Sequence, residues 1–131
     1  PNGDLYLFVQ LNPHSLFKRD GSDLLVEAKI PVTLAALGGA VDVPTPDGGR
    51  VRVTVPAGTQ SGHRFRLRGK GMPVVNKSSK GDLYVDVYIE IPVSLTREQR
   101  KILEELRGIE TTDNQPESAK FNASVDRLKG P

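Results

Sequence analysis

The sequence contains no cysteine and no tryptophan among its 131 residues, and only 5% of the residues are aromatic. Without cysteine, the chain can form no disulfide framework, thiol nucleophile or cysteine-ligated zinc or iron–sulfur site. It also lacks a run of about 18 apolar residues, which a membrane-spanning helix requires, and it shows no signal-peptide pattern. These absences lead us to expect a cytoplasmic protein that has no membrane partner.

A strong excess of one charge is missing as well. Lysine and arginine total 18 against 16 acidic residues, which gives a net charge of +2 and does not predict a strong polyelectrolyte binder. The two histidines, His14 and His63, have no sequence context typical of a general base, and no acidic pair has metal-ligand spacing. The glycine-rich segment 69–71 is too short for a phosphate-binding loop. We therefore expect no enzymatic activity, catalytic residue, metal or cofactor in this chain.

Apolar residues instead recur at every second position, which is typical of strands. The 13 glycines and 10 prolines indicate many turns between these strands. Pro31 should end one strand, and Gly38 should end a short helix over 32–37. The sequence therefore predicts a mostly β fold: a small β-sandwich or barrel with one short internal helix, followed by a C-terminal helix. The alternating runs lie at residues 4–11, 24–30, 41–43, 51–55, 65–67 and 83–91.

One longer helix is expected after the last strand, over residues 96–108. Thr96 and Gln99 have the spacing of a capping box, and Gly108 is placed to close the helix. The apolar stripe of this helix consists of Ile102, Leu103 and Leu106. Because a helix of about three turns is marginal in water, the stripe should pack either against the same helix of a second chain or against the end of the expected barrel. Residues 109–131 are expected to form a polar linker and a weakly amphipathic tail helix.

Basic residues are concentrated between Arg50 and Lys80, where eight lysines or arginines occur without any acidic residue. Arginines alternate along two of the expected strands, and antiparallel pairing of these strands would gather them on one basic face. That face is either a solvated outer surface or a site for an acidic partner such as nucleic acid. Phe65 should point to the face opposite the arginines. Because single-stranded nucleic acids usually bind where aromatic rings lie among basic residues, this argues against a site for single-stranded nucleic acid. The arginines concerned are Arg50, Arg52, Arg64, Arg66 and Arg68.

A short repeat also stands out. GDLYLFVQL, beginning at Gly3, recurs 78 residues later as GDLYVDVYI, beginning at Gly81, with five of nine positions identical. Such a repeat suggests duplicated structural units, with the first copy closing a unit that precedes the others. The apolar segment 26–43 has two interpretations, as plain core or as a groove for extended apolar peptides at a sheet edge.

Several of these segments occur together in the order and spacing of one known family. HSLFKRDGSDLLVEAKIPVTLAALGGAVDVPTPDG, VPAGTQSGHRFRLRGKGMP and KGDLYVDVYIEIPVSLTREQRKILEEL resemble the C-terminal half of DnaJ-type J-domain co-chaperones. The resemblance implies two β-barrels in series and a terminal helix that pairs two protomers. Residues 1–12 would then be the last strand of a preceding barrel, 13–95 the second barrel, 96–108 the dimerisation helix, and 109–131 the linker and tail.

The resemblance also implies a function. A module of this kind presents non-native polypeptide to a DnaK-type chaperone as a homodimer, without a cofactor in this chain. Dimerisation would use the stripe of the helix 96–108. An alternative is a nucleic-acid-associated relative that binds through the arginine face. Matching the client groove of the family onto this sequence places peptide binding on Phe17, Ala28, Ile30, Val41 and Val43.

Overall fold

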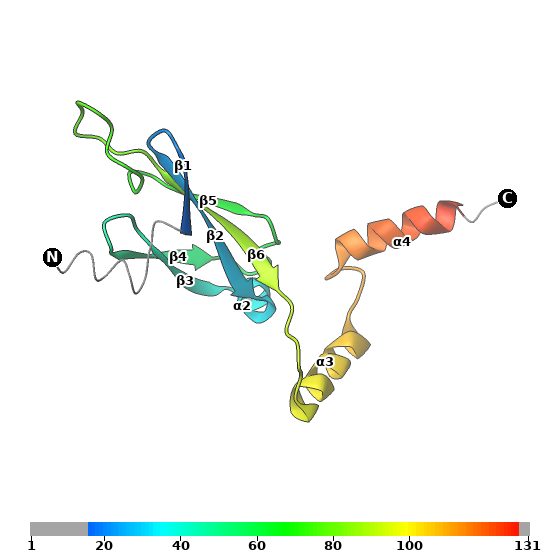
Figure 1. Ribbon diagram of the computed structural model, residues 1–131. Helices are drawn as coiled ribbons and strands as arrows, with labels where there is room; N and C mark the ends of the chain where they lie inside the picture. Colours follow the sequence, from blue (N-terminus) through cyan, green and yellow to red (C-terminus); the bar gives the residue numbers. More distant parts are fainter. Residues whose placement is uncertain (1–15, 129–131) are drawn as a thin grey trace. The chain divides into compact units, whose positions relative to one another are not determined.

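The computed structural model describes residues 16–128, and the alternating run at 4–11 lies outside this range. The chain divides into two compact units, residues 1–92 and 93–131. Strands make up the first unit, with one short helix between them, and the second unit holds two helices (Figure 1). The elements are β1 (Phe17–Asp20), β2 (Asp23–Pro31), α2 (Val32–Leu37), β3 (Gly39–Pro44), β4 (Arg50–Val55), β5 (Arg64–Leu67), β6 (Leu83–Glu90), α3 (Arg97–Ile109) and α4 (Pro116–Leu128).

The described strands form two sheets. The larger has the order β1-β2-β6-β5, and the smaller pairs β3 with β4. β2 and β6 run parallel at the centre of the larger sheet, while β1 and β5 pair with them antiparallel. Figure 1 shows β2 and β6 side by side, with β1 and β5 on either side of them. The predicted fold class is therefore confirmed, as two sheets that do not close into a barrel over the residues described.

A single apolar core holds this unit together. The alternation along β2 and β6 places every second side chain on the inner face of the larger sheet, where the smaller sheet and α2 cover it. The strand expected over residues 83–91 ends one residue early, because β6 stops at Glu90, and Ile91 is 66% exposed. The buried residues are Leu24, Val26, Ile30, Ala35, Val43, Val53, Val55, Leu83, Val85 and Val87.

The short helix α2 lies where the sequence predicts it. Pro31 has an extended backbone and precedes the first helical residue, and Gly38 ends the helix with φ +85°. That backbone conformation favours glycine. A side chain would also be crowded at this position, since a Cβ on Gly38 would lie 3.0 Å from the Ala57 amide nitrogen. The helix thus turns the chain from the larger sheet into the smaller one.

The capping box predicted for the longer helix is present in α3. The Thr96 hydroxyl accepts a hydrogen bond from the Gln99 amide at 3.1 Å, and the Gln99 side chain accepts one from the Thr96 amide at 2.9 Å. The predicted end is wrong, because α3 continues through Gly108 to Ile109. Glu110, with an extended backbone, follows the last helical residue. α4 lies where the tail helix was expected, and neither α3 nor α4 contains a buried residue.

Candidate functional site

The residues expected to bind peptide lie in or against the apolar core. Ile30 on β2 and Val43 on β3 are only 1% and 2% exposed. Ala28 and Val41, from the same two strands, are half-buried and pack against the core, as does Phe17 on β1. The structure therefore brings all five residues to one cluster. Ile30 and Val43 are core residues, and only the other three retain accessible surface.

The stripe expected to mediate dimerisation is exposed on α3. The side chains of Ile102, Leu103 and Leu106 are 56%, 37% and 49% exposed, and Ile109 one turn further is 73% exposed. These positions share one side of the helix, because residues three and four apart are neighbours on a helix surface. Over residues 93–128, the helical unit therefore leaves the apolar side of α3 uncovered.

The arginines do not form the single face that the sequence suggested. The expected pairing is wrong, because β4, with Arg50 and Arg52, lies in the smaller sheet, whereas β5, with Arg64 and Arg66, pairs with β6 in the larger. Arg68 follows the end of β5. The physical reason is local, since the turn after Pro44 folds β4 back onto β3 as a hairpin.

Three of the five arginines are also paired with carboxylates. Arg52 lies 3.2 Å from Asp42, and Arg66 lies 2.7 Å from Asp82. Arg64 makes two hydrogen bonds to Asp86, from Nε to Oδ1 at 2.7 Å and from a terminal nitrogen to Oδ2 at 3.1 Å. The sequence window from Arg50 to Lys80 holds no acid, but its partners come from β3 and from residues after Lys80. Tertiary pairing thus neutralises much of the charge that looked unopposed.

The pair of Arg64 and Asp86 belongs to a polar and aromatic outer face of the larger sheet. Asp86 is only 8% exposed, and its hydrogen bonds from Arg64 hold the pKa of its carboxyl below the usual value against the opposing effect of burial. The Arg64 guanidinium also lies over the Tyr84 ring at 5.2 Å, and Lys29 lies over Tyr88 at 5.6 Å. This face was not among the surfaces expected from the sequence. The one signal for it in the sequence is the charged residue in the middle of the apolar strand LYVDVYI.

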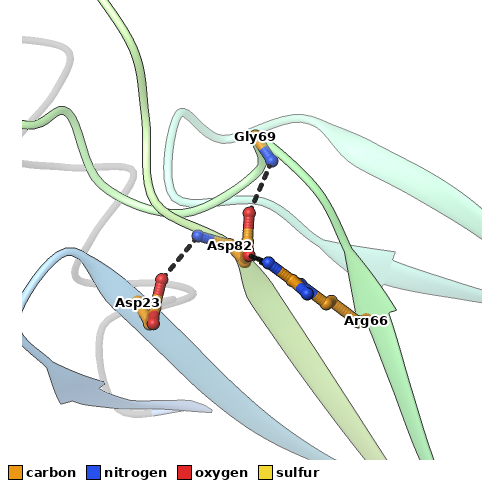
Figure 2. A network of polar contacts seen from close by, with 4 residues as sticks. All are labelled: Asp23, Arg66, Gly69 and Asp82. Carbon is orange, nitrogen blue, oxygen red and sulfur yellow. Dashed lines mark hydrogen bonds and ion pairs between the residues drawn. The ribbon is translucent and has the colours of Figure 1, made fainter.

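The second copy of GDLY anchors the loop that follows β5 (Figure 2). Asp82 accepts hydrogen bonds from the Gly69 amide at 3.0 Å and from Arg66 Nε at 2.7 Å. Its own amide donates to the Asp23 carboxylate at 2.7 Å. These bonds from Gly69 and Arg66 hold the pKa of the Asp82 carboxyl below its usual value. Asp82 therefore ties β5, β6 and the start of β2 together.

The neighbours of Asp82 in the motif have structural roles as well. Gly81 packs so closely against Ser22 that no Cβ fits, and Leu83 is completely buried. Gly71 across the loop is equally restricted, because a Cβ there would lie 2.6 Å from the Ser22 carbonyl oxygen. Packing and hydrogen bonding therefore account for the residues of this motif without a catalytic or ligand-binding role. The first copy of GDLY lies outside the described residues.

Residues 16–128 contain no group of three or more histidine, aspartate or glutamate residues that could hold a metal ion. No helix among them has the length and apolar character needed to cross a membrane.

The sequence profile of one protein family, described as the DnaJ C terminal domain, matches residues 1–92. This match covers all the strands described above. The chain belongs to the DnaJ C-terminal domain family. The resemblance seen in the sequence is therefore confirmed.

Three relatives show how far the similarity extends. The chain is 49% identical over 128 residues to a chaperone protein DnaJ of Rhodospirillum centenum, covering 98% of this chain and 34% of the relative. It is 53% identical over 125 residues to that of a Chelativorans species (95% and 33%), and 51% identical over 130 residues to that of Sinorhizobium medicae (99% and 34%). The chain thus spans about a third of the length of these DnaJ relatives, and the similarity continues beyond the strands into the helical unit.

Proposed function

We propose that this chain is the C-terminal part of a cytoplasmic DnaJ-type co-chaperone that binds non-native polypeptides for a DnaK-type chaperone. Within it, the chain acts as a client-presenting and dimerisation module without enzymatic activity. The observation that carries this proposal is the identity of about half of all positions, over nearly the whole chain, with proteins named chaperone protein DnaJ.

Dimerisation is assigned to the exposed stripe of α3. A 13-residue helix without buried residues is marginally stable in water on its own. Ile102, Leu103 and Leu106 offer a continuous apolar surface that the helical unit does not cover over residues 93–128. Packing against α3 of a second chain would remove this surface from water and would stabilise the helix at the same time.

Sedimentation equilibrium of the 131-residue chain tests this assignment. We expect a dimer that Leu106→Asp converts to monomer, because the dimer interface would then bury an unpaired carboxylate. The matched control is Lys101→Asp, which adds a carboxylate on the polar side of the same helix and should leave the dimer intact. If Leu106→Asp has the same oligomeric state as the parent chain, the interface does not involve this stripe.

Client contact is assigned to the accessible parts of Phe17, Ala28 and Val41, which are supported from beneath by Ile30 and Val43. Binding of reduced carboxymethylated α-lactalbumin, measured by fluorescence anisotropy, tests this surface. Val41→Ser should weaken binding a few-fold through lost apolar contact. The control is Ala40→Ser, which changes the exposed neighbour on the other side of β3. This control should not weaken binding. Equal affinities for the two variants would show that clients bind elsewhere.

The alternative function, binding of nucleic acid, is tested by the salt dependence of duplex DNA binding. Phosphate contacts would make duplex DNA binding fall steeply with salt. The ion pairs of Arg52, Arg64 and Arg66 count against it, because these side chains already have carboxylate partners. We expect weak duplex binding that is unaffected by Arg50→Gln. Tight binding with a steep salt slope would instead favour the alternative.

A further inference from the structure

A cleft of about 350 Å³ opens between the turn that joins β3 to β4 and the loop that follows β5. Its volume is near the lower end for ligand sites, with room for a short segment of an extended chain. Neither the residues assigned to client contact nor those of α3 line it. The cleft is therefore separate from the client surface and from the α3 stripe, although Arg50 of the expected arginine face is among its lining residues.

The charge of the cleft is unbalanced. Arg50, Lys70 and Lys80 contribute to its lining, with Asp47 as the one acid. Arg50 and Lys70 make no ion pair with any residue of the described part of the chain. They differ in this respect from the three arginines whose charges are matched by carboxylates.

Asp47 already has partners. Its carboxylate accepts hydrogen bonds from the Thr45 hydroxyl and, at 3.0 Å, from the Gly49 amide. These two bonds hold the pKa of Asp47 below its usual value, and the nearby charge of Lys80 adds to the effect. The acid thus serves to shape the turn, and the lining retains a net positive charge.

Four aliphatic or proline side chains also line the cleft, and the lining contains no aromatic ring. Val51 and Met72 are half-buried and pack against the core from this side, and Pro46 and Pro73 complete the walls. Without aromatic rings the cleft offers no stacking surface for nucleic-acid bases. Cationic groups beside aliphatic side chains instead suit a polypeptide in which acidic and apolar residues alternate.

The walls of the cleft are held in place by backbone hydrogen bonds. In the turn, the Thr45 and Gly49 peptide groups are joined at 3.0 Å. In the loop, the Gly71 amide donates to the Gly81 carbonyl and the Met72 amide to the Ser22 carbonyl, both at 2.8 Å. A site that is formed before the ligand arrives loses less conformational freedom on binding.

From these observations we propose that the cleft binds an extended polypeptide segment that carries two or more carboxylates beside apolar side chains. The carboxylates would pair with Arg50, Lys70 and Lys80, and the apolar side chains would contact Val51 and Met72. The proposal does not depend on the function assigned above, because the cleft shares no residue with the client surface or with the α3 stripe.

Fluorescence anisotropy with a labelled peptide tests the proposal on the 131-residue chain. The probe is a peptide of about eight residues in which glutamate alternates with leucine or valine, and its twin has glutamine in place of glutamate. We expect the glutamate peptide to bind at least about tenfold more tightly than its twin, since charge-assisted hydrogen bonds are the stronger ones. Equal affinities for the two peptides would overturn the proposal.

Two double variants locate the binding. The double variant Lys70→Gln with Lys80→Gln should lower the affinity for the glutamate peptide about tenfold or more. The double variant Arg68→Gln with Lys77→Gln should change this affinity less than about twofold. The control removes the same charge from the same segment, but outside the cleft. Equal losses in both double variants would show general charge attraction and would overturn the site. Circular dichroism checks the fold of each variant, and Arg50→Gln provides a second test if the first double variant is unfolded.

Competition identifies the class of ligand. Inorganic phosphate and a duplex DNA should displace the labelled peptide only at concentrations well above that of the unlabelled glutamate peptide. If either competes as well as the peptide, the cleft is a phosphate site and the polypeptide assignment is overturned.

Discussion

The two units of this chain use apolar residues in opposite ways. In the strand unit, Leu83, Val85 and Val87 lie on one face of β6 and are completely buried, because the smaller sheet packs over them. In the helical unit, Ile102, Leu103 and Leu106 lie on one side of α3 and remain 56%, 37% and 49% exposed. The sequence shows a periodic apolar pattern in both units, at a period of two in one and near 3.6 in the other.

The difference shows that a periodic apolar pattern predicts which face of a strand or helix is packed. The pattern does not predict which surface packs against that face. For β6, the covering residues come from its own unit. For α3, the helical unit offers no covering surface over residues 93–128. The apolar side of α3 therefore lacks, within its own unit, the packing partner that makes the apolar side of β6 part of a core.

The sharpest way to test this contrast is to truncate one leucine in each unit. Leu83→Ala should lower the free energy of unfolding of the strand unit by about 2–5 kcal/mol, because it leaves a cavity in the core. Leu103→Ala should change that free energy by less than about 0.5 kcal/mol, because it removes no core contact. Urea denaturation followed by circular dichroism measures both, and equal losses would contradict the distinction between the units.

A second comparison concerns buried and exposed ion pairs within the strand unit. Asp86→Asn should cost about 1–2 kcal/mol of unfolding free energy, since it weakens two charge-assisted hydrogen bonds to Arg64 at a buried position. Asp42→Asn breaks the pair with Arg52, in which both side chains are well exposed, and should cost less than about 0.5 kcal/mol. Similar costs in urea denaturation would show that burial does not separate the two pairs.

The same carboxylates predict how stability depends on pH. The pKa values of Asp82 and Asp86 are lowered in the folded chain. Their contribution to stability is therefore fully present above the unfolded pKa of about 4 and is lost as the pH falls through the folded values. The urea midpoint of the strand unit should stay level from about pH 7 to 5 and fall below about pH 4.

Replacing both aspartates with asparagine should make this pH dependence shallower, although the variant is less stable throughout. An unchanged slope below about pH 4 in the double variant would mean that other carboxyl groups control acid unfolding. In the helical unit, the ion pairs of Arg100 with Glu104 and of Lys120 with Glu117 are both exposed.

The last expected effect is confined to one helix of the helical unit. Thr96→Ala removes the hydroxyl of the capping box and should destabilise α3 by about 1 kcal/mol, visible as a reduced helical signal in circular dichroism. The urea midpoint of the strand unit should not move. Thr112→Ala, outside both helices, is the control, and an equal loss of helical signal in this control would argue against the cap.

Much of the strand unit could be predicted from the sequence because its signals are local. Alternation identified β2 and β6, Pro31 and Gly38 bracketed α2, and the spacing of Thr96 and Gln99 predicted the capping box. The end of α3 was not predictable in the same way. A glycine such as Gly108 is common just beyond the end of a helix. A helix can also continue through a glycine when no other interaction favours a turn at that residue.

The candidate sites were less predictable, since they depend on which strands become neighbours. The arginine window had no acid within it, but Asp86 and Asp82 reach Arg64 and Arg66 across the pairing of β5 with β6. The peptide-binding set was assigned to segments that do lie together, but sequence alone could not separate the buried Ile30 and Val43 from their half-buried neighbours.

The sequence by itself determined the mostly β character of the chain, its turns, its helix cap and its family, because each is encoded by residues close together or by motifs in a set order. Only the tertiary structure decided that the arginines lie in two sheets, that Asp82 joins three strands, and that Arg50, Lys70 and Lys80 meet at one cleft. The physical reason is that charge pairing, burial and cleft formation act between residues that are far apart along the chain. They arise only when the sheets have packed.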